Sequence, residues 1–310
     1  MPDDLPAPKE VKLHPSDPGD ENASLYFVGT ATTIMLPNFL HAGDHVHLGP
    51  GVSSTRRTNP AVDLHNLPRI DLVLLSHYHG DHFDQKVEAS LRRDLPMITT
   101  PHARSQLTDK GTDSFTNVFA LEPFESSMVE VASTASRKRR RLRVTAMPGK
   151  HVPPNPIVES LNAVAHAIPP INGWMLELGA GETDEVTDFV SGYRIYITGD
   201  TLMVDELQEI PKRYADKRID LMLAHLGGTT VPSPKLPLAL MVTMDAKQGV
   251  EMIRLIQPDL TIPIHYDDYE VFASPLDDFK MEIQKAGLKG KVVYLDRGEK
   301  FEFAVREARL

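Results

Sequence analysis

The segment HYHGDH contains three histidines and one aspartate within six consecutive positions: His77, His79, Asp81 and His82. Buried polar groups need partners, so these residues cannot simply fill an apolar core. They form either a solvated turn or a metal-binding segment, because imidazoles and carboxylates are good ligands for divalent ions such as Zn²⁺.

The apolar run that precedes this segment predicts a strand that ends at the first histidine. In extended backbone, residues i and i+2 point to the same side, so His77 and His79 can reach one ion. Gly80 permits a tight turn, after which Asp81 and His82 face a second position nearby. Strand ends expose functional groups in open α/β scaffolds, which favours a metal site over a turn.

Three further apolar runs each end at one ligand-type side chain. LRVTAM leads through a Pro-Gly turn to His151, YRIYIT ends at Gly199 and Asp200, and LTIPI ends at His265. A single histidine or aspartate at such a place is more often a loop residue or a helix cap. The recurrence of the pattern makes a shared metal centre the better interpretation.

The composition is that of an ordinary globular protein, with 310 residues, 41% hydrophobic residues and a net charge of −10. The acidic balance argues against a nucleic-acid partner. The absence of cysteine excludes disulfides, thiolate zinc sites and cysteine nucleophiles. No apolar stretch approaches the roughly 20 residues of a membrane span, and the N-terminus has no apolar signal core. We expect a cytoplasmic protein with a small-molecule or lipid-like substrate, and we leave a homo-oligomer open.

Strand-like runs alternate with helical patterns, which predicts an α/β architecture with sheets between layers of helices. Residues 1–22 are polar and rich in proline, and we expect a flexible tail there and a single domain over 23–310. Strands are expected at SLYFVG, IDLVLLS, MITT, NVFALE, LRVTAM, WMLEL, YRIYIT, IDLMLAH, LTIPIH and KVVYL, and helices over 84–94, 103–110, 204–215, 245–257 and 276–287.

Four other segments need an interpretation. RIDLVLLSH and RIDLMLAH are nearly the same strand, which suggests two similar half-sheets, although chance explains the match equally well. The Pro-rich residues 152–173 are expected to form a loop that covers the site, and the basic run 136–143 a solvated hairpin turn. His41, His45 and His47 have ligand spacing but follow no strong strand, so we expect a loop beside the cleft rather than metal ligands.

The order of the motifs resembles the metallo-β-lactamase superfamily: HxHxDH, a distant histidine, a strand ending in Gly-Asp, and a late histidine. The resemblance covers about residues 24 to 304 and implies a four-layer αβ/βα sandwich with a dinuclear site between pseudo-symmetric halves. It implies that one ion is held by His77, His79 and His151, the second by Asp81, His82 and His265, and both by Asp200.

Within the superfamily, the sequence is more similar to the branch that contains N-acylphosphatidylethanolamine-hydrolysing phospholipase D and L-ascorbate-6-phosphate lactonase. The similarity lies in FVGTATTIML, LLSHYHGDHFD, YITGDT, MDAKQG and IPIHYDDY. The second strand of that branch, which usually ends in Asp-Pro, looks shortened here. The similarity implies a hydrolase in which two divalent ions, Zn²⁺ or else Mn²⁺ or Fe²⁺, share a hydroxide that cleaves a phosphodiester or a lactone or ester. A catalytically silent metal-binding or interaction scaffold is the alternative.

Two residues are expected to take part in catalysis. Asp81 is one of them, in addition to its role as a ligand. The other is His225, which ends the run IDLMLAH before Gly227 and Gly228 and could donate to a leaving group or an oxyanion. A structural histidine is an equally good interpretation of His225.

Two carboxylates follow the last ligand, Asp267 and Asp268, and one of them could orient a ligand imidazole. Asp245 precedes a helical pattern and is expected to cap that helix.

Overall fold

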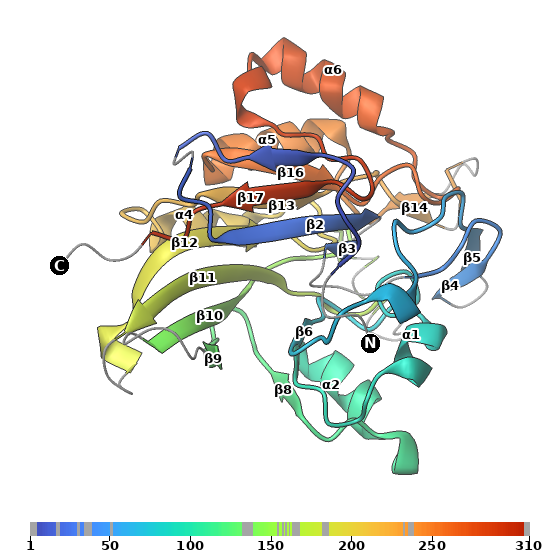
Figure 1. Cartoon of the computed structure of the whole chain (residues 1–310). Helices are drawn as coiled ribbons and strands as arrows, with labels where there is room; N and C mark the ends of the chain where they lie inside the picture. Colours follow the sequence, from blue (N-terminus) through green and yellow to red (C-terminus); the bar gives the residue numbers. More distant parts are fainter. Residues whose placement is uncertain are drawn as a thin grey trace.

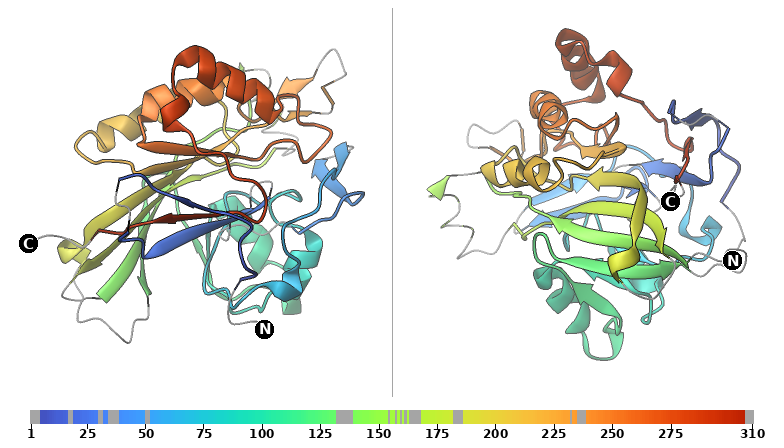
Figure 2. Two further views of the ribbon diagram at one scale, coloured as in Figure 1. Left: turned by 45° about the horizontal axis from the view of Figure 1, so that its top comes forward. Right: turned by 90° about the vertical axis from the view of Figure 1, so that its left-hand side faces the viewer.

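The structure is a computed structural model of the whole chain (Figure 1). Figure 2 shows from two further sides that the strands are gathered in the middle of the molecule, with helices on opposite outer faces. The structure describes residues 5–16, 19–29, 32–33, 39–49, 52–131, 139–153, 155–156, 158, 160, 162, 168–181, 186–231, 233–234 and 239–306.

Among these residues, the largest sheet has six strands in the order β16-β13-β12-β11-β10-β9. The strands β12, β13 and β16 run parallel, and β9 to β12 run antiparallel. The bounds are β9 (Ser126–Val131), β10 (Arg139–Met147), β11 (Gly173–Gly181), β12 (Val190–Ile197), β13 (Leu221–His225) and β16 (Leu260–Ile264).

Two smaller sheets make up the other half of the molecule, in the orders β1-β17-β2-β3 and β6-β7-β8. Two short hairpins, β4–β5 and β14–β15, stand apart from them. The bounds are β1 (Val11–Leu13), β2 (Ala23–Gly29), β3 (Thr32–Thr33), β4 (His45–Gly49), β5 (Val52–Thr55), β6 (Val73–Leu74), β7 (Met97–Thr99), β8 (Val118–Ala120), β14 (Thr230–Val231), β15 (Leu240–Met241) and β17 (Lys300–Phe303).

The helices lie where the apolar periodicity predicts them: α1 (Gln85–Ser90), α2 (Pro101–Thr108), α4 (Glu209–Arg213), α5 (Ala246–Ile256) and α6 (Leu276–Ala286). The expected cap of α5 is confirmed, because the Asp245 side chain accepts a hydrogen bond from the amide of Gln248. The helix ends at Gln257, which is left-handed and precedes Pro258, a residue that cannot continue the helix.

Three apolar cores separate the layers, and the alternation of side chains along each strand creates them. On β13, Leu221 and Leu223 face the core between the sheets, together with Phe27 and Phe301. Met222 on the same strand faces the core beneath α5 and α6. A third core lies between β6, β7 and the helices α1 and α2. The order helix, sheet, sheet, helix is the predicted four-layer αβ/βα arrangement.

The two similar segments of the sequence belong to different sheets. Strand β6 lies in the three-stranded sheet and β13 in the six-stranded sheet. Leu74 of β6 and Leu223 of β13 pack in the same central core.

Several expectations need correction. Residues 1–22 are not a flexible tail throughout, because Val11–Leu13 form β1 and pair in parallel with β17. KVVYL forms no strand; its Val292 makes an isolated bridge to Thr261. That residues 23–310 form one domain stays a prediction.

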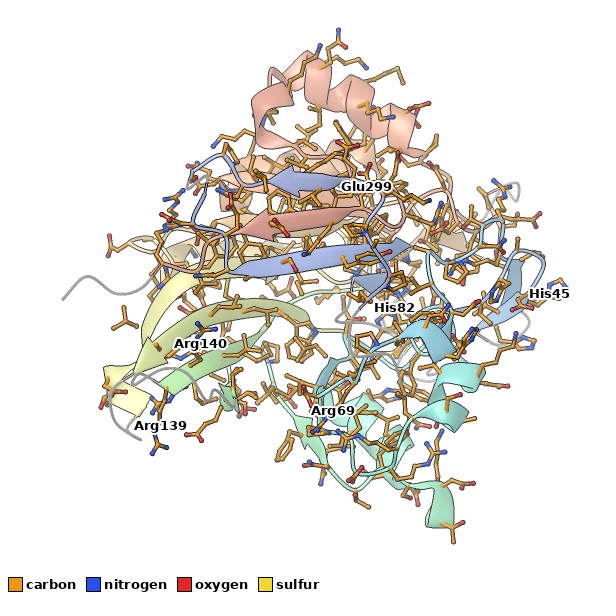
Figure 3. All side chains as sticks on the ribbon, in the orientation of Figure 1. His45, Arg69, His82, Arg139, Arg140 and Glu299 are labelled. Carbon is orange, nitrogen blue, oxygen red and sulfur yellow. The ribbon has the colours of Figure 1, made fainter. Side chains whose placement is uncertain are left out.

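The basic run is not a solvated turn in its described part, because residues 139–143 begin strand β10. Figure 3 shows Arg139 and Arg140 at one end of the molecule, away from His82. Arg141 is buried and pairs with Asp188, with Nη1 and Oδ1 3.0 Å apart. An ion-pair partner and the strand ladder therefore account for this segment.

The Pro-rich segment 152–173 falls partly outside the described residues, so its role as a cover stays a prediction. No helix of the part that the structure describes is long and apolar enough to cross a membrane.

Candidate metal centre

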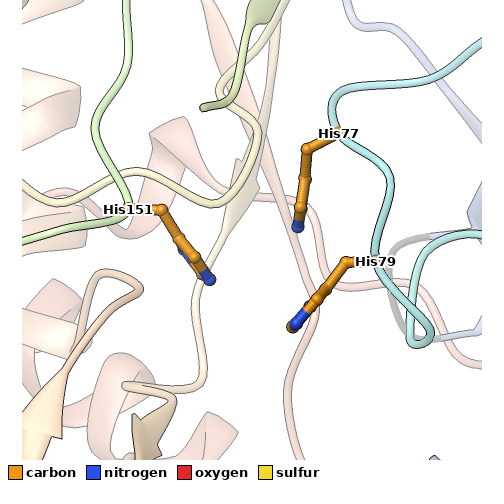
Figure 4. Close-up of side chains that lie close together, drawn as sticks. All are labelled: His77, His79 and His151. Atoms are coloured by element: carbon orange, nitrogen blue, oxygen red, sulfur yellow. The ribbon is translucent and has the colours of Figure 1, made fainter. Parts of the chain in front are cut away.

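The structure brings the seven predicted ligands together as two groups. One group consists of His77, His79 and His151, whose rings converge in Figure 4. The other consists of Asp81, His82, Asp200 and His265. Within each group, one potential ligand atom of every residue lies within 4.8 Å of the others. The groups are adjacent, because the rings of His77 and His82 have centroids 4.3 Å apart.

Strand ends position these side chains, as the sequence predicts. Asp200 follows β12, His225 is the last residue of β13 and His265 follows β16. These three strands are parallel neighbours, so their carboxyl ends meet at one edge of the sheet. His151 follows β10, and His77 follows β6 of the facing half.

Hydrogen bonds to one ring nitrogen orient the imidazoles and leave the other nitrogen for a ligand. His151 Nδ1 donates to the backbone carbonyl of Asp200 over 2.9 Å, and His265 Nδ1 to that of Leu226 over 3.0 Å. His79 Nδ1 lies 2.8 Å from Asp81 Oδ1. Carbonyl and carboxylate acceptors require a proton on Nδ1, so Nε2 carries the lone pair whenever the ring is neutral.

Unpaired buried atoms show that this donor set fits a divalent ion. His77 and His265 are fully buried, Asp200 is 1% exposed, and all three lie at the centre of the two groups. His77 Nε2 and Asp200 Oδ1 are buried with no hydrogen-bond partner among the described residues, whereas His265 Nε2 lies 3.3 Å from Asp200 Oδ2. Leaving a buried group unsatisfied costs about 1–3 kcal/mol. Coordination to an ion would remove this cost at His77 Nε2 and Asp200 Oδ1.

The electrostatics of the centre keep the carboxylates ionised and two of the imidazoles neutral. Burial alone would raise the pKa of Asp200, but the neighbouring His265 and His82 outweigh it and hold that pKa well below its ordinary value. Burial lowers the pKa of His151 to about 4 and that of His77 well below the usual range. Neutral imidazoles and ionised carboxylates are the forms that bind metal ions.

His265 differs from the other imidazoles. Burial lowers its pKa, but Asp200 and Asp81 raise it to about 9. A divalent ion would take the place of this proton, so metal binding at His265 releases a proton.

The backbone at His265 is strained, with a φ of 63° in the left-handed region. The backbone at Gly227 comes close to this strained residue, since a Cβ on Gly227 would lie 2.5 Å from the His265 carbonyl oxygen. Strained backbone is common at functional sites, where the surrounding structure has to hold it.

Asp267 and Asp268 make contacts other than the expected one. Asp267 accepts a hydrogen bond from the amide of Leu276 at the start of α6. Asp268 is fully buried and bonds Thr58 and Arg297. For His265, the carbonyl of Leu226 takes the orienting role that we expected of a carboxylate.

His225 lies beside the second group, with its ring centroid 6.1 Å from that of His82 and 5.7 Å from that of His265. Its ring is fully buried, and neither ring nitrogen has a hydrogen-bond partner among the described residues. Burial lowers its pKa to about 3. His225 is therefore neutral, with one N–H available to donate.

Of the three histidines that precede the HYHGDH segment, His45 and His47 lie on strand β4 and not in a loop, whereas His41 lies in the loop before that strand. His41 Nε2 pairs with Asp63 Oδ1 over 2.8 Å. No further ligand group is found in the described part of the chain. That these three histidines are not metal ligands stays a prediction.

A small, partly enclosed cleft leads to the centre. Its described lining consists of His79, Asp81, His151, Ile168, Thr229, Val231 and Val242. Sequence analysis missed Thr229, although the preceding Gly227 and Gly228 are the signal that the backbone there comes close to the site.

Two β-sheets between layers of helices, with histidines and aspartates at the ends of their strands, define the architecture of a metal-dependent hydrolase. The family model described as "Beta-lactamase superfamily domain" matches residues 45–266. The chain therefore belongs to the metallo-β-lactamase superfamily, and it is a metal-dependent hydrolase.

Curated relatives bear the same description. The UPF0173 metal-dependent hydrolase of Archaeoglobus fulgidus is 26% identical over 235 residues, 76% of this chain and 83% of the relative. That of Methanopyrus kandleri is 26% identical over 232 residues, 75% of this chain and 82% of the relative.

Solved structures share the fold. An isothiocyanate hydrolase from Delia radicum gut bacteria superposes with a TM-score of 0.67 at 14% identity, over 91% of this chain and all of that one. A possible metal-dependent hydrolase from Veillonella parvula has a TM-score of 0.64 at 16% identity, over 90% of this chain and 98% of that one.

Proposed function

We propose that this chain is a dinuclear hydrolase that cleaves a phosphodiester or a lactone or ester. One divalent ion would be held by His77, His79 and His151, and a second by Asp81, His82 and His265. The observation that carries the proposal is the pair of adjacent ligand groups, in which His77 Nε2 and Asp200 Oδ1 are buried without a hydrogen-bond partner among the described residues. Zn²⁺ suits this donor set best, and Mn²⁺ or Fe²⁺ accept the same ligands.

Asp200 is proposed to contact both ions. Its Oδ2 lies 3.0 Å from His82 Nε2 and 3.3 Å from His265 Nε2, within the second group. Its Oδ1 is buried without a hydrogen-bond partner among the described residues. Burial lowers the pKa of His151, and the charge of Asp200 opposes this effect. The carboxylate therefore acts electrostatically on the first group as well.

Two divalent ions would lower the pKa of a bound water and polarise the oxygen of the substrate. The residues of this chain have to orient that water and to assist the leaving group. Asp81 suits the first task, because His79 Nδ1 fixes its Oδ1 while Oδ2 faces His82 and His265 at 3.8 and 3.7 Å. His225 suits the second task as a neutral donor beside the second group.

The choice of substrates rests on the sequence similarity to the branch of N-acylphosphatidylethanolamine-hydrolysing phospholipase D and L-ascorbate-6-phosphate lactonase. A phosphodiester and a lactone both develop negative charge on an oxygen that two cations can stabilise. A lipid-like or other small substrate, a cytoplasmic location and the lack of a nucleic-acid partner remain predictions.

The proposal predicts two metal ions per chain. Elemental analysis after reconstitution with Zn²⁺ or Mn²⁺ should give about two equivalents, and a chelator should abolish hydrolysis of bis(p-nitrophenyl) phosphate, of a simple lactone, or of both. His77→Ala and Asp200→Ala should lose metal, because each removes a buried ligand atom. His41→Ala and His45→Ala are the matched controls and should keep it. Less than one equivalent in the reconstituted wild type would contradict the dinuclear centre.

A further inference from the structure

Thr229 is a buried residue whose hydroxyl has no evident role in the fold. It is 4% exposed, and its Oγ1 is buried without a hydrogen-bond partner among the described residues. Its backbone is held in place, because its carbonyl accepts from the amide of Val242 over 2.8 Å and it forms a bridge with Phe272. Native structures satisfy most buried hydroxyls, so an exception at a functional site points to a missing ligand.

The next residue shows the contrast. The hydroxyl of Thr230 donates to the carbonyl of Gly228 over 2.8 Å and is therefore satisfied within the chain. Thr229 instead lines the cleft together with His79, Asp81 and His151, which belong to the two ligand groups. Thr229 is thus the one polar residue of the described lining that is not a proposed ligand.

The rest of the described lining is apolar. Ile168, Val231 and Val242 form it, and neither lysine nor arginine is among the described residues that line the cleft. Moving a charged group from water against such walls is costly unless it is paired. Two ions would compensate the charge that develops on the reacting oxygens, but not a charge carried by the neighbouring substituents. The described part of the cleft therefore suits a substrate that is uncharged beside its scissile bond.

We propose that Thr229 is a substrate-contacting residue and that the substrate is a neutral ester or lactone, a choice that rests on the proposed function. In the reaction, the oxygen of water bonds to the carbonyl carbon and the bond from this carbon to the alkoxide oxygen breaks. The electron pair of that bond stays on the alkoxide, which takes up the proton that water loses. Thr229 keeps its own proton and donates a hydrogen bond to the substrate oxygen.

Two substitutions separate the hydroxyl from the shape of the side chain. Thr229→Val removes the hydroxyl and keeps the branched shape, and it should lower kcat/KM for a neutral lactone by about 10²-fold, as loss of one oxyanion donor does. Thr229→Ser keeps the hydroxyl and should retain most of the activity. Thr230→Val is the matched control, since its hydroxyl bonds within the chain. Metal content should equal that of the wild type in all three, and Thr229→Val should not lower the Tm, because it removes an unsatisfied buried group.

The outcomes distinguish this inference from the function on which it rests. Full lactone turnover by a metallated Thr229→Val protein would overturn the role of Thr229 and leave the hydrolase intact. Hydrolysis of the phosphodiester in preference to neutral lactones and esters would overturn the substrate class alone. A wild-type protein that carries two ions but hydrolyses neither the phosphodiester nor the lactones and esters would overturn the proposed function and this inference with it.

Discussion

His225 and His265 have rings only 5.7 Å apart, yet their protonation differs. Burial acts on both, but Asp200 and Asp81 raise the pKa of His265 to about 9, whereas the pKa of His225 falls to about 3. The difference arises from contact with the carboxylates, since His265 Nε2 lies 3.3 Å from Asp200 Oδ2. In the proposed mechanism, His225 would therefore be a neutral N–H donor, and His265 a ligand that would exchange a proton for an ion.

Replacing His225 tests this assignment. His225→Ala should lower kcat by about 10²-fold or more, because the leaving oxygen loses a donor in a water-poor site. The metal content, measured by elemental analysis, should stay at the wild-type value, because His225 belongs to neither ligand group. His225→Gln keeps an N–H donor and should recover part of the turnover. Loss of an ion in either variant would make His225 a ligand or a support of one, against our assignment.

At the scale of elements, the hairpin β4–β5 contacts two of the three loops that carry the candidate ligands of the second group. Val46 of β4 packs with Tyr269, Val271 and Phe272, which follow the last ligand. The same side chain lies against Gly80, in the turn of the HYHGDH segment. At the base of the hairpin, the amide of Arg57 donates to the carbonyl of Asp268 over 2.8 Å. The hairpin thus fixes one ligand loop relative to the other.

Gly80→Ala tests this role of the hairpin. A Cβ at Gly80 would lie 2.8 Å from Val46 Cγ2 and 3.0 Å from the His47 carbonyl oxygen, so the hairpin or the ligand loop has to shift. We expect a loss of about 1–3 kcal/mol in the free energy of unfolding, typical of overpacking, and weaker metal binding. Gly290→Ala is the control, because a Cβ there meets nothing within 4 Å. An unchanged urea midpoint together with unchanged metal affinity in Gly80→Ala would argue against the tight contact.

The elements that carry the ligands could be predicted from the sequence, and the element that supports them could not. Strands such as β13 and β16 are buried on both faces and therefore read as continuous apolar runs. In the described part of strand β4, the exposed His45 and His47 flank the buried Val46, so the segment resembles a polar loop. KVVYL shows the opposite case. Its apolar composition predicts a strand, but composition alone does not supply a partner strand to pair with.

The site could be predicted for the same reason. Each candidate ligand lies at the end of an apolar run or within a few residues after it, and the sequence shows that directly. Thr229 and the carbonyl of Leu226 could not be predicted, because their roles depend on how the chain turns after β13 and on which carbonyl faces His265. Positions of this kind are created by tertiary packing and carry no pattern of their own.

At the scale of the whole molecule, the N-terminal segment packs against the sheets at the end opposite the candidate metal centre. Strand β1 brings the N-terminal segment onto β17, and His14 follows it. His14 is 2% exposed and lies edge-on against Tyr193 and Phe301, with ring centroids 5.7 and 6.1 Å away. Asp220, Asp259 and Arg218 are the charged groups that act on it. A segment that composition marks as a tail is in this way packed against the central core.

This packing predicts that the stability of the fold depends on pH through His14, a residue far from the candidate metal centre. Burial lowers the pKa of His14 below its ordinary value of 6.5, although Asp220 and Asp259 oppose the effect. The unfolded chain therefore binds a proton more readily than the folded one, so His14 makes the folded state lose stability as the pH falls through 6.5.

His14→Phe keeps the contacts between rings and removes the titration. The stability advantage of the wild type over His14→Phe should shrink between about pH 8 and about pH 5.5, by at most about 1.4 kcal/mol, because the window reaches only one pH unit below the ordinary pKa. Urea unfolding of both proteins at the two pH values measures this difference. Leu13→Ala, at an exposed neighbour, should shift the stability equally at both pH values. If the difference between the wild type and His14→Phe stays constant or grows as the pH falls, His14 is not held neutral by its burial, and the N-terminal segment is packed less firmly than the structure indicates.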